Sequence, residues 1–184
     1  MVLSPNFRCV RRLRRSERLE LLRGSHYGFA AQGTAVISAP ELAAVQPEEV
    51  WVVAEAGELC AALEVPQFEQ CLRGVLFPMG GIAGVWCYPE YRNRGFVRLL
   101  MSAAWQQMRS RRQGVSMLCP FSVEYYAQFG YVPASGYGVV SFPLSAWQPW
   151  RGLDCEGWQV RRFPAEVVGE ECLRVFKGDR PENP

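Results

Sequence analysis

Residues 84–98 have the sequence GVWCYPEYRNRGFVR, which is the most informative stretch of the chain. An apolar segment ends at Pro89, an arginine-bearing turn follows, and an amphipathic helical pattern begins at Gly95. A turn that enters a helix directs several unpaired backbone N–H groups at one spot, with the positive end of the helix dipole behind them. The stretch therefore indicates a diphosphate-binding site, with an exposed arginine turn that only caps the helix as the alternative.

The side chains of this turn suit an anionic ligand. Arg92, Arg94 and Arg98 would add positive charge, and Gly95 would let the backbone approach a phosphate without a Cβ in the way. The sequence has neither the G-K-[ST] of a Walker A loop nor a dinucleotide-binding G-x-G-x-x-G. A protein that uses this turn for ATP or NAD is therefore disfavoured.

Strand and helix patterns surround this stretch. Phe96, Leu100 and Ala104 repeat at helical spacing after Gly95. The glycines at 80, 81 and 84 predict a bulge or a close backbone approach in one strand. The element order predicts a mixed α/β domain with a mostly antiparallel sheet flanked by helices, and a later βαβ crossover. We expect strands over 7–13, 50–54, 59–65, 76–88, 115–119 and 136–143, and helices that start at Ser16 (stopping at Gly24), at Ser38, at Gly95 and at Ser122.

A second informative stretch covers residues 122–133, with the sequence SVEYYAQFGYVP. A short helix carrying Tyr125 and Tyr126 would end in an aromatic-glycine-aromatic turn. Taken alone, this pattern favours a packing role, with Phe129 and Tyr131 below the sheet and one tyrosine hydroxyl in water.

Composition excludes several classes of protein. The 184 residues include 20 basic and 18 acidic side chains, a balance that argues against nucleic acid or a membrane surface as partner. His26 is the sole histidine, which excludes His-rich metal sites. Seven cysteines without C-x-x-C spacing are typical of reduced cytosolic thiols. No apolar run has the length of a signal peptide or a membrane span, so we expect a soluble, cytoplasmic chain.

The two stretches together resemble the GCN5-related N-acetyltransferase (GNAT) superfamily, whose acyl-CoA motif is R/Q-x-x-G-x-G/A. Here the motif stands as Arg92-x-x-Gly95-x-Val97, with valine in place of the small last residue. The segments PMGGIAGV (78–85), PEYRNRG (89–95) and YAQFGY (126–131) look like the Eis (enhanced intracellular survival) acetyltransferases. The resemblance covers about residues 5–144.

The resemblance implies a GNAT fold in which acetyl-CoA, as co-substrate, lies in a cleft between splayed central strands, with no metal. It implies that the backbone of Val85, Trp86 and Cys87 pairs with the pantetheine arm and that Phe121 and Ser122 line the far side of the cofactor. Tyr126 would protonate the departing thiolate. The diphosphate would be held by Arg92, Asn93, Arg94, Gly95, Phe96, Val97 and Arg98.

The role of Tyr126 also has a chemical basis. Coenzyme A leaves as a thiolate with a pKa of about 8.5, and a tyrosine with a pKa of about 10 beside the sulfur can donate a proton to it. Cys87 follows two apolar strand residues and has no histidine nearby in sequence, so we do not expect a nucleophile there. Glu124 and His26 are candidate bases by residue type only; we interpret Glu124 as a solvated helix residue and His26 as a surface-loop histidine.

The resemblance also predicts the domain organisation. Residues 1–144 would form the acetyltransferase domain, 145–157 a linker, and 158–184 a strand and helix resembling the truncated start of a second GNAT-like domain. In Eis-like enzymes the base is thought to be the C-terminal carboxylate of a third domain, so it has no counterpart here.

Two functions follow. The first is an N-acetyltransferase acting on a small-molecule or lysine-type amine such as a polyamine or an aminoglycoside. The second is a truncated or non-catalytic acyl-CoA-binding module. A homo-oligomer is an option for either.

Overall fold

The computed structural model describes residues 9–29, 36–136, 141, 143, 145–146, 162–164, 167–170 and 172. The chain divides into two compact units, Met1–Val132 and Pro133–Pro184. The strand expected over 136–143, the linker and the strand expected at 158–163 lie largely outside the described residues. Residues 167–170 and 172, within the expected C-terminal helix, are helical. The proposed second domain stays a prediction.

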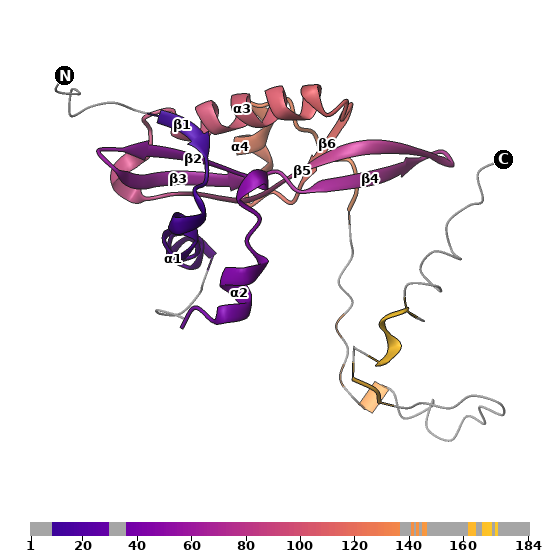
Figure 1. The fold of residues 1–184 in the computed structure, drawn as a ribbon. Coiled ribbons are helices and arrows are strands. Elements are labelled where there is room, and N and C mark those ends of the chain that lie inside the picture. Colours follow the sequence, from indigo (N-terminus) through magenta and orange to yellow (C-terminus); the bar gives the residue numbers. More distant parts are fainter. Residues whose placement is uncertain are drawn as a thin grey trace, which may run out of the picture. The chain divides into compact units, whose positions relative to one another are not determined.

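The first unit is built on a six-stranded, mostly antiparallel open sheet, as expected from the sequence (Figure 1). Its order is β1-β2-β3-β5-β4, and β6 runs parallel to β5 on the other edge of that strand. The connection from β5 through a helix to β6 is the predicted βαβ crossover. The strands are β1 (Cys9–Arg12), β2 (Val50–Glu55), β3 (Glu58–Glu64), β4 (Gln67–Leu72), β5 (Val75–Cys87) and β6 (Val115–Leu118).

Helices cover both faces of this sheet. In Figure 1, α1 (Arg18–Phe29) and α2 (Ala39–Ala44) lie below the sheet, and α3 (Phe96–Ser110) and α4 (Val123–Ala127) lie above it. Short 3-10 turns precede α1 (Arg15–Glu17), β2 (Pro47–Glu49) and the turn into α3 (Pro89–Tyr91). The sheet is therefore the middle layer of three.

Two apolar clusters hold these layers together. Because side chains alternate across a strand, β2, β3 and β5 each contribute to both clusters. The cluster under α3 contains Leu63 and Ile82 of the sheet with Phe96, Leu100, Met101 and Ala104 of the helix. The cluster against α1 contains Leu21, Val52, Ala62 and Trp86.

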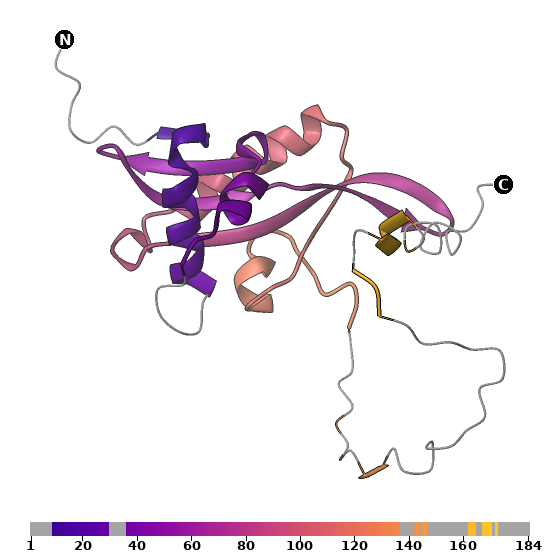
Figure 2. The same ribbon diagram turned by 60° about the horizontal axis from the view of Figure 1, so that its bottom comes forward.

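The strands expected over 50–54 and 59–65 form a hairpin, β2–β3, and the structure adds a second hairpin, β4–β5. Ala56 and Gly57, with φ of 53° and 92°, form the first turn; Arg73 and Gly74, with φ of 53° and 83°, form the turn between β4 and β5. Strand β4 was not predicted, because QFEQCL lacks apolar alternation and most of it is exposed. Figure 2 shows this hairpin extending beyond the rest of the sheet.

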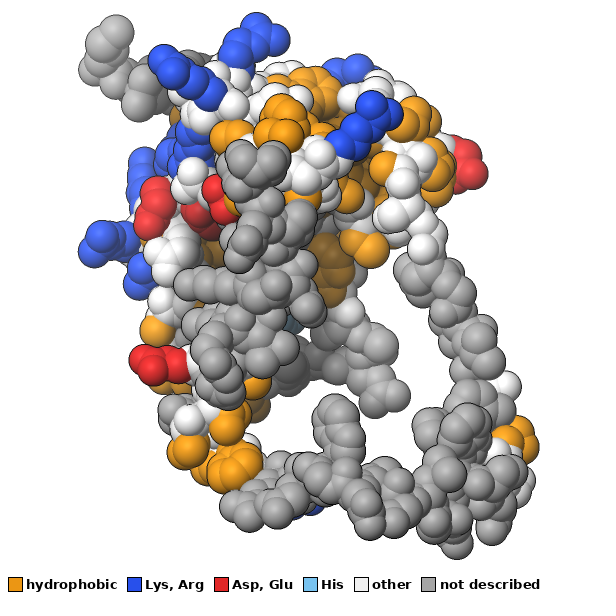
Figure 3. All heavy atoms as spheres, turned by 90° about the vertical axis from the view of Figure 1, so that its right-hand side faces the viewer, with side chains coloured by type: hydrophobic (Ala, Val, Ile, Leu, Met, Phe, Trp, Pro, Cys, Tyr) orange, Lys and Arg blue, Asp and Glu red, His pale blue; other side chains and the backbone are white. Residues whose placement is uncertain are grey.

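Exposed apolar side chains gather on the β4–β5 hairpin. Figure 3 views the chain from that end, where hydrophobic side chains are grouped. The residues are Phe68, Leu72, Val75, Leu76 and Phe77, each between 41% and 52% exposed.

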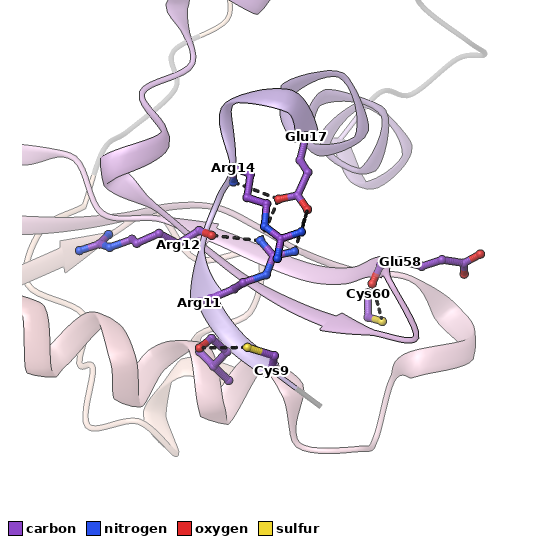
Figure 4. A network of polar contacts seen from close by, with 8 residues as sticks. Cys9, Arg11, Arg12, Arg14, Glu17, Glu58 and Cys60 are labelled. Carbon is purple, nitrogen blue, oxygen red and sulfur yellow. Dashed lines mark hydrogen bonds and ion pairs between the residues drawn. The ribbon is translucent and has the colours of Figure 1, made fainter. Parts of the chain in front are cut away.

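The start and end expected for the first helix are wrong. Ser16 lies in the 3-10 turn and does not cap α1, and the helix continues through Gly24 to Phe29. The turn is instead fixed by Glu17, whose carboxylate accepts two hydrogen bonds from the Arg11 guanidinium, at 2.7 and 2.8 Å, and one from the backbone N–H of Arg14 (Figure 4). Gly24 does not end the helix. Its missing side chain instead leaves room for the ring of Trp86.

The expected starts of the other helices are confirmed. Ser38 caps α2 in a capping box with Glu41, and Ser122 caps α4 by accepting a hydrogen bond from the Tyr125 N–H. Gly95 precedes α3.

Candidate functional site

The central strand β5 loses one of its neighbours halfway along. Its ladder with β6 runs from Met79 to Ile82, whereas its pairing with β3 begins at Ala83 and continues to Cys87. Among the described elements, the edge of residues 83–87 that faces away from β3 therefore has no strand partner. Backbone groups left free in this way can pair with an extended ligand as an added strand.

The predicted bulge lies at the start of this open edge. Gly84 has a φ of +55°, and the register between β3 and β5 shifts between Ala62 and Glu64. Trp86 turns its side chain into the α1 cluster, whereas Val85 and Cys87 pack against the α3 cluster. The three residues predicted to hold the pantetheine arm are thus consecutive in β5. Their side chains pack on the two faces of the sheet, and their backbone lies at the open edge of the strand.

The turn that follows presents the start of α3. Asn93 and Gly95 have positive φ values of 58° and 76°, and no side chain caps the helix at Gly95. A Cβ placed on Gly95 would meet no atom within 4 Å, so there is open space beside the residue that precedes the helix. Phe96 is buried in the core, so its backbone alone is available to a ligand, and Val97 is partly buried. The geometry fits a diphosphate group.

Arg94 is held by its surroundings. Its Nη2 donates to Glu55 Oε1 at 2.8 Å, and its guanidinium lies 5.4 Å from the Tyr91 ring centroid and 5.1 Å from that of Phe96. A guanidinium has five N–H donors, so this ion pair leaves others for an anion.

The other two arginines also have protein partners. Arg92 Nε donates to the backbone oxygen of Cys87 at 3.3 Å, and Arg98 Nη2 donates to Gln128 Oε1 at 3.1 Å. Both side chains remain exposed. The Arg98 contact links α3 to the turn after α4, where the second predicted stretch lies.

Tyr126 is buried in an aromatic cluster on α4. It is 5% exposed, and its ring lies 5.2 Å from that of Tyr125, 5.7 Å from that of Phe121 and 6.3 Å from that of Tyr131. The Tyr131 hydroxyl pairs with Ser116 Oγ at 2.6 Å, whereas no residue in the described part of the chain hydrogen-bonds the Tyr126 hydroxyl.

Burial raises the pKa of Tyr126 above its usual value of 10, and the neighbouring phenols of Tyr125 and Tyr131 raise it further. The side chain is therefore a protonated phenol at neutral pH. Burial also raises the pKa of the adjacent Tyr125, and an ionised Cys87 thiol at the end of β5 would raise it further. The residue that the sequence predicts as proton donor is thus a buried phenol that keeps its proton at neutral pH.

The remaining predicted ligands lie beside Tyr126. Phe121 is 78% exposed, and Ser122 accepts the N–H of Tyr125 at 3.1 Å while its hydroxyl donates to Glu124 at 2.9 Å. Burial raises the pKa of the Cys87 thiol. The thiol therefore stays protonated, in line with the expectation that it is not a nucleophile.

The two candidate bases differ. Glu124 is exposed on α4, as expected. His26 is not in a loop: it lies in α1, where its Nε2 contacts Glu41 Oε1 at 3.2 Å and its Nδ1 is buried without a partner among the described residues.

One acidic residue near the open edge was not singled out from the sequence. Glu64 ends β3 opposite the bulge, and its side chain lies against Gly84. The available signal was an acidic side chain in the otherwise apolar run over 59–65, since unpaired carboxylates are rare in buried strands.

In the described ranges no group of three or more His, Cys, Asp or Glu residues is placed to hold a metal ion. No helix within those ranges is long and apolar enough to cross a membrane.

The chain is similar to known acetyltransferase structures. A GCN5-related N-acetyltransferase from Kribbella flavida matches with a TM-score of 0.60 and 27% identity, over 68% of this chain and 33% of that one. A probable N-acyltransferase from Enterococcus faecalis matches with a TM-score of 0.59 and 24% identity, over 67% of this chain and 32% of that one. Eis1 from Mycobacterium abscessus matches with a TM-score of 0.59 and 16% identity, over 68% of this chain and 31% of that one. The chain thus spans about a third of the length of these proteins.

No curated protein matches the chain. The family model for the acetyltransferase (GNAT) domain matches residues 9–134, which is more than half of the sequence and includes β5, the turn into α3 and α4. Together with the six-stranded sheet that opens beside β5, this match shows that the chain belongs to the GNAT acetyltransferase family.

Proposed function

We propose that this chain is an acetyl-CoA-dependent N-acetyltransferase that transfers the acetyl group to an amine by direct attack on the thioester. The acceptor class is a small-molecule or lysine-type amine, such as a polyamine, an aminoglycoside or a lysine side chain. The observation that carries the proposal is the separation of β5 from β6 after Ile82, in the strand that leads into the start of α3.

The backbone of this opening suits the co-substrate. The free edge at Val85, Trp86 and Cys87 would pair with the amide groups of the pantetheine arm, and its N–H groups would stabilise negative charge on the thioester oxygen. The N–H groups at the start of α3, with the arginines around them, would hold the diphosphate. Phe121 and Ser122 would line the far side.

Tyr126 is the proton donor in this proposal. When the amine nitrogen bonds to the acetyl carbon and the carbon–sulfur bond breaks, the sulfur leaves with the electron pair and takes the phenol proton. The raised pKa of Tyr126 keeps that proton in place until the thiolate forms.

Finer assignments rest on the sequence. The segments 78–85, 89–95 and 126–131 favour the Eis-like branch, and the cysteine content favours the cytoplasm. We propose neither nucleic acid nor a membrane as partner, because the net charge is only +2.

A non-catalytic acyl-CoA-binding module is the second candidate. What favours it is that the chain spans about a third of the length of the similar structures from Enterococcus faecalis and Kribbella flavida. Such a module would bind acetyl-CoA without acetylating any amine.

Calorimetric titration of the purified chain tests the proposal. We expect acetyl-CoA to bind with micromolar affinity and ATP, the control, not to bind. A panel of spermidine, kanamycin and a lysine-containing peptide then separates turnover from binding alone. Failure of acetyl-CoA to bind would overturn the proposal.

A further inference from the structure

The carboxyl group of Glu64 lies directly on the backbone of β5. A Cβ built on Gly84 would be 2.8 Å from Glu64 Oε1 and 3.1 Å from its Cδ. Any side chain at position 84 would therefore displace the carboxylate, and the positive φ of Gly84 further disfavours one. The bulge glycine leaves room for this carboxyl group at the first residues of the open edge.

The carboxyl group lies on the face of the sheet opposite Tyr126. Ala62 of β3 is paired with Trp86 of β5, and both belong to the α1 cluster. Because side chains two apart in a strand share a face, Glu64 and Gly84 lie on that same side. Helix α4 lies on the α3 side (Figure 1). The Glu64 carboxylate, against Gly84, and the Tyr126 phenol, on α4, thus lie on opposite faces of the sheet.

Glu64 has no compensating partner. No described residue hydrogen-bonds its carboxylate or forms an ion pair with it. Burial raises the pKa of Glu64 above its usual value of 4.5, and the negative charge of Glu49, in the 3-10 turn before β2, raises it further. A partly buried carboxylate without a cation or a donor needs an explanation beyond stability, because desolvation without a partner is costly.

We propose that Glu64 is the general base that accepts the proton of the acceptor amine. This inference rests on the proposed function and names the group that the sequence did not supply. Neighbouring strands lie about 4.8 Å apart. The Glu64 carboxylate, which lies against Gly84, would therefore reach a thioester bound along the open edge of β5, either directly or through one water molecule.

The proton and electron balance is complete. The amine lone pair bonds to the acetyl carbon as the N–H proton passes to the Glu64 carboxylate. The carbon–sulfur bond breaks, and the sulfur takes the proton of Tyr126. The products are an N-acetyl amine and the thiol of coenzyme A. Glu64 then loses its proton to water and Tyr126 regains one.

His26 is the competing base. Its Nδ1 is buried without a partner among the described residues, but its Nε2 already contacts Glu41, which is also held by Ser38. It projects from α1 toward α2, whereas Gly24 and Gly28 of the same helix face Trp86. The imidazole is therefore turned away from β5, and Glu64 is the better-placed group.

The test compares Glu64→Gln with the unaltered chain, using spermidine, kanamycin and a lysine-containing peptide as acceptors. We expect kcat to fall by about 10²-fold or more, as for loss of a general base. The affinity for acetyl-CoA, measured by calorimetry, should stay within about twofold. The matched control is Glu69→Gln, an exposed acid on β4, which should keep full activity. Glu64→Asp keeps the carboxylate and should retain part of the rate, which separates chemistry from folding.

The pH profile provides a second readout. In the unaltered chain kcat should fall on the acid side with an apparent pKa above 4.5, and that limb should vanish in Glu64→Gln. Full activity of Glu64→Gln, or a limb that persists there and vanishes in His26→Gln, would overturn the inference. Equal loss of acetyl-CoA binding and rate would assign Glu64 a structural role and overturn it as well. Failure of the unaltered chain to bind acetyl-CoA, or to acetylate any amine, would overturn the proposed function itself.

Discussion

The indole ring of Trp86 lies against the backbone of Gly24. A Cβ on Gly24 would be 2.4 Å from both Cη2 and Cζ2 of the ring, and one on Gly28 would be 3.2 Å from Trp86 Cβ. These two glycines, one helical turn apart, allow α1 to pack closely against β5. The contact holds β5 in place against α1. Because β5 is the strand with the open edge, packing on the α1 side supports the geometry of the candidate site.

Gly24→Ala should destabilise the chain. Alanine gains about 1 kcal/mol of helix propensity over glycine, but a methyl group forced against an immobile ring typically costs about 1–3 kcal/mol. Trp86 is 4% exposed and has no room to move aside. We expect a lower urea midpoint, whereas Gly114→Ala, where a Cβ meets no atom within 4 Å, should leave it unchanged. A more stable Gly24→Ala variant would show that the ring yields.

Tyr126→Phe should lower kcat by about 10²-fold while the affinity for acetyl-CoA stays nearly unchanged. The substitution removes only a hydroxyl without a partner among the described residues, so the aromatic cluster should remain intact. Tyr125→Phe, the adjacent phenol, serves as the control in the same kinetic assay. If binding and rate fall together, the role of Tyr126 is structural.

Arg94→Ala should weaken the binding of coenzyme A by about tenfold, which corresponds to about 1.4 kcal/mol, and leave the binding of pantetheine unchanged. Pantetheine lacks the diphosphate, so calorimetry with both ligands isolates the charge contribution of the turn. Arg109→Ala is the control, since it lies at the far end of α3, about 20 Å along the helix. Equal weakening of both ligands would mean that Arg94 supports the turn only through Glu55.

The chain should self-associate through the β4–β5 hairpin. Strand β4 ends the sheet and carries exposed apolar side chains, and an apolar edge of this kind pairs readily with a second copy. Leu76→Lys should reduce the mass measured by light scattering at high concentration. Val132→Lys, which changes a 78% exposed residue outside the hairpin, should not. A monomeric unaltered chain would contradict this expectation.

The sequence predicts elements whose signals are local. The two strands on either side of residues 55–58, the helical repeat after Gly95 and the serine caps of α2 and α4 each have their signal within a few residues, and the structure confirms them. Other features depend on contacts between distant segments. The place of Gly24 inside α1 follows from Trp86, and the position of Glu64 follows from the register of β3 and β5. Neither is visible in a single stretch of sequence.

The ion pair between Arg11 and Glu17 should make stability depend on pH in the acid range. The hydrogen bonds from Arg11 lower the pKa of Glu17 below its usual value of 4.5, and the backbone N–H of Arg14 lowers it further, against the opposing effect of burial. The folded state therefore binds this proton less tightly than the unfolded state does. By linkage, the contribution is fully present above pH 4.5 and is lost as the pH falls through the lower, folded-state pKa.

Urea unfolding at pH 6 and at pH 3 measures this effect in the unaltered chain and in Glu17→Gln. At pH 6 the variant should be less stable by about 1–3 kcal/mol, because the buried guanidinium of Arg11 loses a charged acceptor. At pH 3 the two proteins should converge, since the carboxyl group of the unaltered chain is then increasingly protonated. Glu20→Gln, an exposed acid in the first turn of α1, should show no such convergence. A constant difference between Glu17→Gln and the unaltered chain at both pH values would mean that Glu17 acts through packing of the turn and not through its charge.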